Sequence, residues 1–102
     1  MYVEDEIERL KRQKNNLRFD DLVRICQYFF GNAKVTSSHH HFRMPWPGDP
    51  RINLQKRKGQ AKPYQVKQVI AALTKLSIEQ EEKRKLEAEL GEKRGEIRHV
   101  TE

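Results

Sequence analysis

The chain has little of what several classes of protein require. Only one of its 102 residues is a cysteine, Cys26, so neither a disulfide within the chain nor a cysteine-ligated zinc site is expected. No apolar run approaches the roughly 20 residues that a membrane-spanning helix needs. The first residues, MYVEDEIERLKRQK, are charged throughout, so we do not expect a secretory signal. These absences favour a protein of the reducing cytoplasm that has no membrane contact.

The motifs of common nucleotide- and metal-dependent enzymes are also missing. Neither G-x-x-x-x-G-K-[ST] nor G-x-G-x-x-G occurs in the sequence. Between residues 17 and 78 the only acidic residues are Asp20, Asp21 and Asp49, which are too few and too scattered to bind a pair of metal ions. Hydrophobic residues make up 35% of the chain, which is enough for one modest core. We therefore expect no cofactor and no metal.

Positive charge is concentrated in the middle of the chain. Lys and Arg number 21 against 15 Asp and Glu, which gives a net charge of +6. Residues 17–78 contain eleven basic and three acidic residues, a net charge of +8, whereas residues 1–16 are neutral overall and residues 79–102 carry −2. Such an excess attracts polyanions, of which nucleic acid is the most abundant in a cytoplasm. A basic, solvated surface without a partner is the alternative interpretation.

Three segments have the apolar periodicity of helices. They are residues 3–14, whose narrow stripe predicts an accessory helix, residues 18–30, whose stripe is wider, and a segment from residue 63 to about residue 78. Gly31 is a typical helix end, and Pro63 suits the first turn of a helix. From residue 79 the sequence is highly charged, so it could continue the helix, bind a partner or fray. Gly91 and Gly95 favour an end or a loosening of the segment near those positions.

Short strands are predicted between the second and third helices, at residues 33–36, 39–44 and 51–55, with a proline-rich turn at 45–50 and a basic loop at 56–62. The order helix, three strands, helix predicts an α+β fold of α-β-β-β-α type. In this fold two helices cover one face of a three-stranded antiparallel sheet, as in double-stranded-RNA-binding domains. We therefore expect a core domain at residues 17–78, a helical extension at residues 1–16 and a charged tail at residues 79–102.

Three consecutive histidines, His39, His40 and His41, fall within the second predicted strand. Successive side chains of a strand point to opposite faces, so His39, His41 and Arg43 share one face. His40 shares the other face with Phe42, which favours the core. His39 and His41 are therefore expected on the open face of the sheet. Because neighbouring histidines point in opposite directions, all three cannot bind one metal ion.

Histidine and arginine on an open face suit the cleavage of RNA. An imidazole can accept or donate a proton near neutral pH, and a guanidinium can hold a phosphate. In attack of a ribose 2′-hydroxyl on its own phosphodiester, His39 would act as acid or base, and His41 is the candidate for the second group. The candidate RNA-binding residues are Arg43 and four residues of the basic loop, Lys56, Arg57, Lys58 and Lys62. The alternative is that the histidines are ordinary surface residues.

Two further side chains have a structural and a functional interpretation. Trp46 lies between two prolines and could stack on a base, but covering a hydrophobic edge is the favoured interpretation. Cys26 lies on the apolar stripe of the second helix and is expected to fill the core rather than act as a nucleophile.

Four segments together resemble the HicA family of ribonuclease toxins from bacterial toxin–antitoxin pairs. They are residues 18–22 (RFDDL), 38–43 (SHHHFR), 45–51 (PWPGDPR) and 59–69 (GQAKPYQVKQV). The resemblance covers residues 17–78 and implies the fold of a double-stranded-RNA-binding domain. Members of this family usually carry Gly-Ser-His at the start of the histidine strand, and this chain has Ser37 in place of the glycine.

The resemblance implies a cytoplasmic mRNA interferase that cleaves mRNA without a metal and is neutralised by a HicB-like antitoxin covering the active face. The family's catalytic histidine follows the serine, which corresponds to His39, with His40 as the second choice. The extensions at residues 1–16 and 79–102 could contact the antitoxin or form a homo-oligomer. Two other functions stay open at this point. One is a non-catalytic RNA-binding module, and the other is a protein-interaction module that works through the charged tail.

Overall fold

The computed structural model describes residues 1–48, 50–56 and 58–101, and side chains as far as Gly91. The elements are α1 (Val3–Gln13), α2 (Phe19–Phe30), β1 (Lys34–Thr36), β2 (His39–Arg43), β3 (Arg51–Gln55) and α3 (Pro63–Thr101). The predicted α+β class and the predicted order of elements are both confirmed. In the part of the chain that the structure describes, no helix combines the length and apolar composition needed to cross a bilayer.

The three strands form one antiparallel sheet in the order β1-β2-β3. In the register of β1 and β2, Lys34 lies opposite His41. In the register of β2 and β3, His41 lies opposite Asn53, and Arg43 lies opposite Arg51. Since directly opposed residues point to the same face of a sheet, this register decides which side chains accompany the histidines.

The turn between β1 and β2 contains Ser37. Ser37 has φ +55°, in the left-handed region that glycine occupies at least cost. The backbone therefore has the conformation that a glycine would favour, and the serine adopts it. The turn sets the register that places β2 beside β1.

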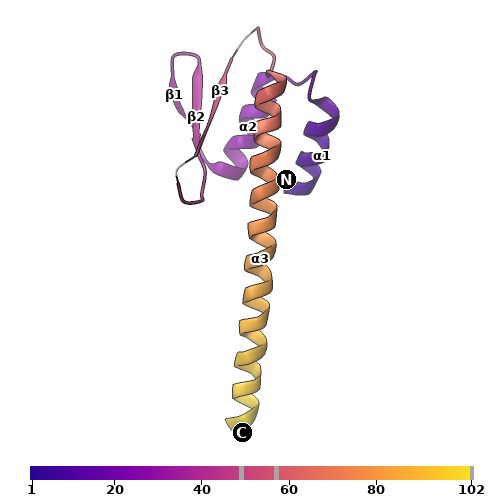
Figure 1. Ribbon diagram of the computed structural model, residues 1–102, viewed down its shortest axis with the longest axis vertical. Helices are drawn as coiled ribbons and strands as arrows, with labels where there is room; N and C mark the ends of the chain where they lie inside the picture. The colour runs from indigo at the N-terminus through magenta and orange to yellow at the C-terminus, as the bar shows by residue number, and fades with distance from the viewer. Residues whose placement is uncertain (49, 57, 102) are drawn as a thin grey trace.

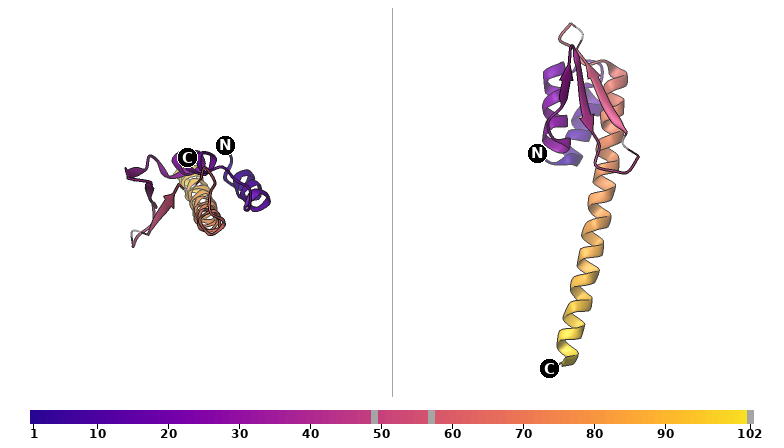
Figure 2. Two further views of the ribbon diagram at one scale, coloured as in Figure 1. Left: turned by 90° about the horizontal axis from the view of Figure 1, so that it is seen from above. Right: turned by 90° about the vertical axis from the view of Figure 1, so that its left-hand side faces the viewer.

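The molecule has three layers, as Figures 1 and 2 show. Helices α2 and α3 cover one face of the sheet, and α1 lies on the far side of these two helices. The other face of the sheet is open. The sheet contributes two fully buried side chains, Phe42 and Leu54, to the core. They join buried side chains of the helices, which include Phe19, Leu22, Ile25, Val66, Val69 and Leu73.

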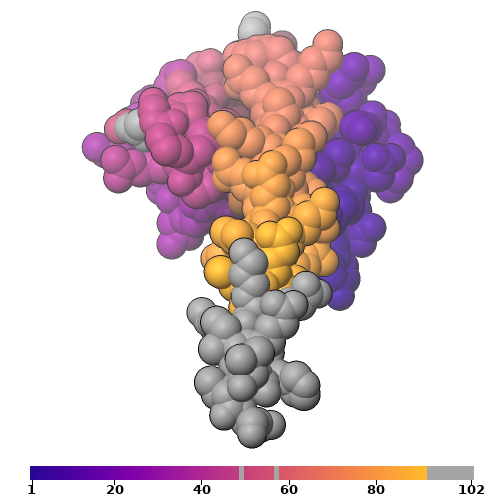
Figure 3. Space-filling model, turned by 60° about the horizontal axis from the view of Figure 1, so that its bottom comes forward, coloured from indigo at the N-terminus to yellow at the C-terminus, as the bar shows by residue number. Residues whose placement is uncertain are grey.

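Helix α1 is docked on the body rather than frayed, and it lies along α3 (Figure 3). Its predicted stripe is buried and belongs to the same hydrophobic core as the sheet. Arg9 forms an ion pair with Asp21 of α2 at 3.7 Å. The Ser77 hydroxyl of α3 donates a hydrogen bond of 3.1 Å to the carboxylate of Glu4. These contacts connect α1 to both helices of the middle layer.

Helix α3 is longer than the sequence pattern predicts. It continues through Gly91 and Gly95 to Thr101, so the segment from residue 79 continues the helix, which was one of the open alternatives, and an end at these glycines is wrong (Figure 1). Each glycine costs a helix about 1 kcal/mol relative to alanine, but it does not remove a backbone hydrogen bond as proline does. The surrounding Glu, Lys, Arg and Leu residues are good helix formers, and they offset that cost.

Cys26 fills the core, as predicted, and its thiol is shielded from water. Burial raises the pKa of this thiol from 9.0 to about 12. At pH 8 the native protein therefore holds about a thousandfold less thiolate than the unfolded chain. We expect Ellman's reagent to react with Cys26 at least that much more slowly in the native protein than in urea, measured at one pH. Similar rates in the two conditions would contradict this burial.

Candidate active site

The open face of the sheet carries the two histidines predicted for it. The rings of His39 and His41 are nearly parallel, with an interplanar angle of 21° and centroids 6.0 Å apart. His40 lies on the face covered by the helices, where its ring meets Phe19 edge-on at 5.1 Å. Its Nδ1 atom is buried and has no hydrogen-bond partner among the described residues. The predicted division of the three histidines between the two faces is therefore confirmed.

His39 is held by a side chain of the neighbouring strand β3. Its Nδ1 atom lies 3.1 Å from Oδ1 of Asn53. An amide oxygen can only accept a hydrogen bond, so Nδ1 carries a hydrogen and donates it. In the neutral ring, the lone pair that can accept a proton is then on Nε2. This contact fixes both the orientation and the tautomer of His39, as a general base requires.

His41 is held from the other side, by strand β1. Its Nε2 atom lies 2.9 Å from the hydroxyl oxygen of Thr36. A hydroxyl can donate or accept, so this contact suits either tautomer of the neutral ring and also the imidazolium. As an imidazolium, His41 can donate one hydrogen to Thr36 and keep the hydrogen on Nδ1. That second hydrogen is available for transfer to a leaving group, as a general acid requires.

Cationic side chains surround the histidines. Lys34, Arg43 and Arg51 come from three different strands, and with His41 they line a depression of about 270 Å³ on the open face. The residues of the three strands include no aspartate or glutamate. The face therefore combines two proton-transfer groups with groups that attract phosphate.

One lysine of the basic loop reaches this face. Nζ of Lys62 lies 3.3 Å from Oε1 of Gln55, and Gln55 is the residue opposite His39 in the sheet. Of the other predicted RNA-binding residues, Lys56 and Lys58 are exposed. In the part of the chain that the structure describes, no hydrogen bond or ring contact joins the side chain of Lys56 or Lys58 to a histidine. Arg57 lies outside the described residues.

The end of the basic loop is fixed to the start of the second helix. The backbone N–H of Phe19 donates a hydrogen bond of 3.1 Å to the carbonyl oxygen of Gly59, and the N–H of Ala61 donates one of 2.8 Å to the carbonyl oxygen of Leu17. These bonds place Lys62 immediately before α3 and beside the sheet. A lysine so anchored loses less conformational entropy when it binds a phosphate than a lysine of a free loop.

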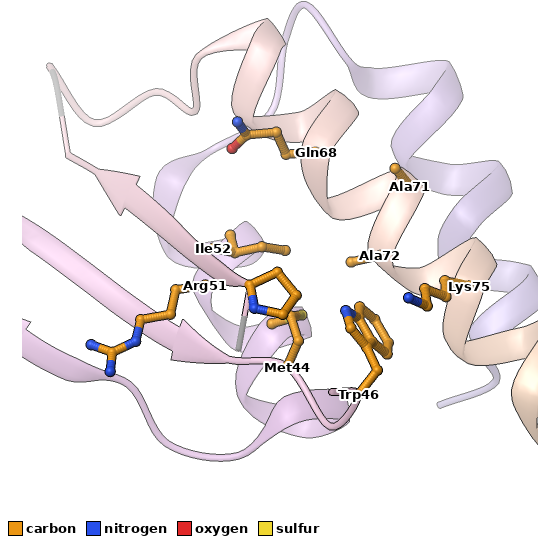
Figure 4. A pocket seen from close by; sticks show the side chains of 9 residues that line it. Met44, Trp46, Arg51, Ile52, Gln68, Ala71, Ala72 and Lys75 are labelled. Atoms are coloured by element: carbon orange, nitrogen blue, oxygen red, sulfur yellow. The ribbon is translucent and has the colours of Figure 1, made fainter. Parts of the chain in front are cut away.

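Trp46 covers a hydrophobic edge, as the favoured interpretation predicts. Its ring meets Phe30 edge-on at 6.2 Å, and Nζ of Lys75 lies over it, 4.6 Å from the centroid. Trp46 also lines a cavity of about 330 Å³ between β3 and α3, whose walls include Met44 and Ile52 (Figure 4). The side chain of Arg51 points away from this cavity (Figure 4). Stacking of a base on Trp46 would first require Lys75 to move.

The residues that orient the histidines are absent from the sequence prediction. Asn53 and Thr36 touch the histidine rings, and Lys34 and Arg51 complete the cationic surface. One signal for Asn53 is present, because it alternates with Ile52 and Leu54 and so must lie on the polar face of its strand. The contact of Asn53 with His39 could not be predicted, because it depends on the register between β2 and β3, which the turn between them sets.

The described residues contain no group of three His, Cys, Asp or Glu side chains that could together hold a metal ion. The chain matches no family model, no curated protein and no solved structure. Its function is therefore inferred from the geometry and chemistry of the open face.

Proposed function

We propose that this protein is a metal-independent endoribonuclease of the HicA type, the toxin of a toxin–antitoxin pair, with a fold like that of double-stranded-RNA-binding domains. The observation that carries the proposal is the pair His39 and His41. Their rings lie 6.0 Å apart on an open face that has no acidic residue on its strands, and each is held by a neutral side chain of a different neighbouring strand. Paired histidines beside cations are the groups that cyclising cleavage of RNA needs.

The proposed reaction transfers two protons and breaks one P–O bond. Nε2 of His39 takes the proton of the ribose 2′-hydroxyl, and the 2′-oxygen attacks the adjacent phosphorus. His41, as an imidazolium, gives its Nδ1 hydrogen to the 5′-oxygen as that oxygen leaves. The products are a 2′,3′-cyclic phosphate and a 5′-hydroxyl. Lys62 stabilises the negative charge that develops on the oxygens of the cleaved phosphate, while Asn53 and Thr36 hold the two rings.

The proposal is tested with the purified protein and a long single-stranded RNA in the presence of EDTA. We expect cleavage, with cyclic phosphate on one product end and a 5′-hydroxyl on the other. Expression without a partner protein should also arrest growth. Products ending in a 5′-phosphate, or cleavage that stops when EDTA is added, would contradict the proposed chemistry.

A non-catalytic RNA-binding module is the second candidate, and the cationic surface of the open face favours it because such a surface attracts RNA whether or not it cleaves it. That candidate predicts binding that weakens with salt and no cleavage. Removal of Lys62 would then lower the slope of log K against log salt by about 1. Binding without cleavage in the assay above would favour this second function.

The partner of the proposed toxin is a HicB-like antitoxin, and the long α3 offers a surface for it. Leu86 and Leu90 lie four residues apart on α3, and both are exposed. If residues 79–102 are the contact, their deletion should abolish binding of the partner and leave cleavage of RNA unchanged. Loss of cleavage in the deleted protein would instead place the tail in the nuclease itself.

A further inference from the structure

The depression lined by Lys34, His41, Arg43 and Arg51 lies beside the histidine pair but does not include His39. We infer that it is a phosphate subsite, which holds the phosphate next to the one that is cleaved. The inference rests on the proposed ribonuclease function, and it specifies how the substrate lies on the face. The subsite would make the enzyme one that recognises an extended single strand through at least two consecutive phosphates.

The register of the sheet builds the depression from three strands. Lys34 of β1 is opposite His41 of β2, and one residue pair farther along on the same face Arg43 is opposite Arg51 of β3. Side chains that share a face of a strand are two residues apart, about 6.8 Å. A row of His39, His41 and Arg43 therefore extends along β2, with a proton-transfer pair at one end and a cationic group at the other.

The chemistry of the lining suits a phosphate. A guanidinium presents its N–H groups as a planar fork that can bind two phosphate oxygens at once, and lysine adds a compact charge. A volume of about 270 Å³ is about nine times the share of one water molecule in the liquid, about 30 Å³, so a hydrated phosphate group fits.

His41 belongs both to the histidine pair and to the depression. It lines the depression and also stacks on His39. The depression therefore lies next to the position, between His39 and His41, where the cleaved phosphate would bind. An acidic segment of a partner protein could also bind three cations. The position of the depression on the reacting face favours RNA, because a strand that lies along β2 reaches both places with successive phosphates.

The experiment uses oligonucleotides in which one ribose lies at a cleavage position mapped on a long RNA and every other sugar is 2′-deoxy, so that only one bond can be cut. In two further substrates, the phosphate on the 5′ side or the 3′ side of that bond is replaced by a neutral methylphosphonate. We expect one of the two replacements to lower kcat/KM about 10- to 100-fold, the usual effect of losing a hydrogen bond to a charged group. The other replacement should have a much smaller effect.

Variants of the cations assign that effect to the depression. Lys34→Ala and Arg51→Gln should each lower kcat/KM on the unmodified substrate. In these variants, the methylphosphonate that slows the wild-type protein should cause little further loss of kcat/KM. As controls, Lys11→Ala and Arg24→Gln remove one lysine and one arginine charge from α1 and α2, away from the open face. In these variants the same methylphosphonate should lower kcat/KM as much as it does in the wild-type protein. Thermal unfolding of each variant shows whether it is folded.

The outcomes separate the inference from the function on which it rests. If the wild-type protein does not cleave the unmodified substrate or the long RNA, the proposed function itself fails and the subsite fails with it. If it cleaves both but neither methylphosphonate slows it, the subsite alone is wrong. The subsite is equally wrong if the sensitive methylphosphonate slows Lys34→Ala and Arg51→Gln as much as it slows the wild type. In that last case the cations serve another ligand, such as an acidic partner protein.

Discussion

Replacement of His39 by alanine is expected to abolish most RNA cleavage without unfolding the protein. General acid–base catalysis by one group contributes about 10²- to 10⁴-fold to a rate, so we expect a loss of that size in single-turnover cleavage. His39 is half-exposed on the open face, outside the hydrophobic core, so the free energy of unfolding should change by less than about 1 kcal/mol. RNA binding should persist, because the cations that attract phosphate remain.

The adjacent histidine supplies the matched control. His40 lies under the sheet against Phe19, and its buried Nδ1 atom has no partner among the described residues. His40→Phe keeps an aromatic ring at this position and removes the unpaired nitrogen, so the protein should stay folded and should cleave RNA at close to the wild-type rate. Equal cleavage by wild type and His39→Ala, or loss of cleavage in folded His40→Phe, would overturn the assignment of His39.

The sequence permits the prediction of the histidine face because the rule involved is local. Alternation along one strand needs only the strand itself and one large apolar residue, Phe42, to indicate the buried side. The helices are predicted for the same reason, since their stripes and the stop at Gly31 are read from neighbouring residues. Local patterns therefore recover the elements, their order and the placement of His39 and His41.

The partners of the histidines could not be predicted because they depend on pairing between strands. Asn53 reaches His39 from a strand 14 residues farther along the chain, and Thr36 reaches His41 across a turn. A shift of one residue in either register would move a different side chain to each ring and reverse its face. The backbone of Ser37, at φ +55°, contributes to that register, and its conformation is not evident from a serine in the sequence.

The extent of α3 could not be decided from the sequence, for a different reason. Gly91 and Gly95 have low helix propensity, but propensity is a sum over many residues rather than a property of two. The residues from Glu79 to Leu90 are nearly all strong helix formers, and no proline follows Pro63. A helix that has already formed its first turns extends at little cost per residue, so isolated glycines do not end it.

The second large effect concerns His41, and it separates the acid from the base. We expect His41→Ala to slow cleavage of ordinary RNA by about 10²- to 10⁴-fold, because the 5′-oxygen would then leave without a proton. A substrate in which sulfur replaces that 5′-oxygen has a leaving group that needs no proton. On the sulfur substrate His41→Ala should regain most of the wild-type rate, whereas His39→Ala should stay slow because the 2′-hydroxyl must still lose its proton.

The comparison of ordinary RNA with the sulfur substrate shows which histidine is the acid and which is the base. Neither variant shows this on ordinary RNA alone. Rescue of His39→Ala by sulfur, with no rescue of His41→Ala, would exchange the two roles. That exchange would put the acid on the histidine held by Asn53, whose Nδ1 hydrogen is already committed, and would leave Nε2 to carry the transferred proton. If sulfur rescued neither variant, proton transfer to the leaving group would not be the step that His41 serves. Its place beside Lys34 and Arg43 would then indicate a role in binding phosphate rather than in moving a proton.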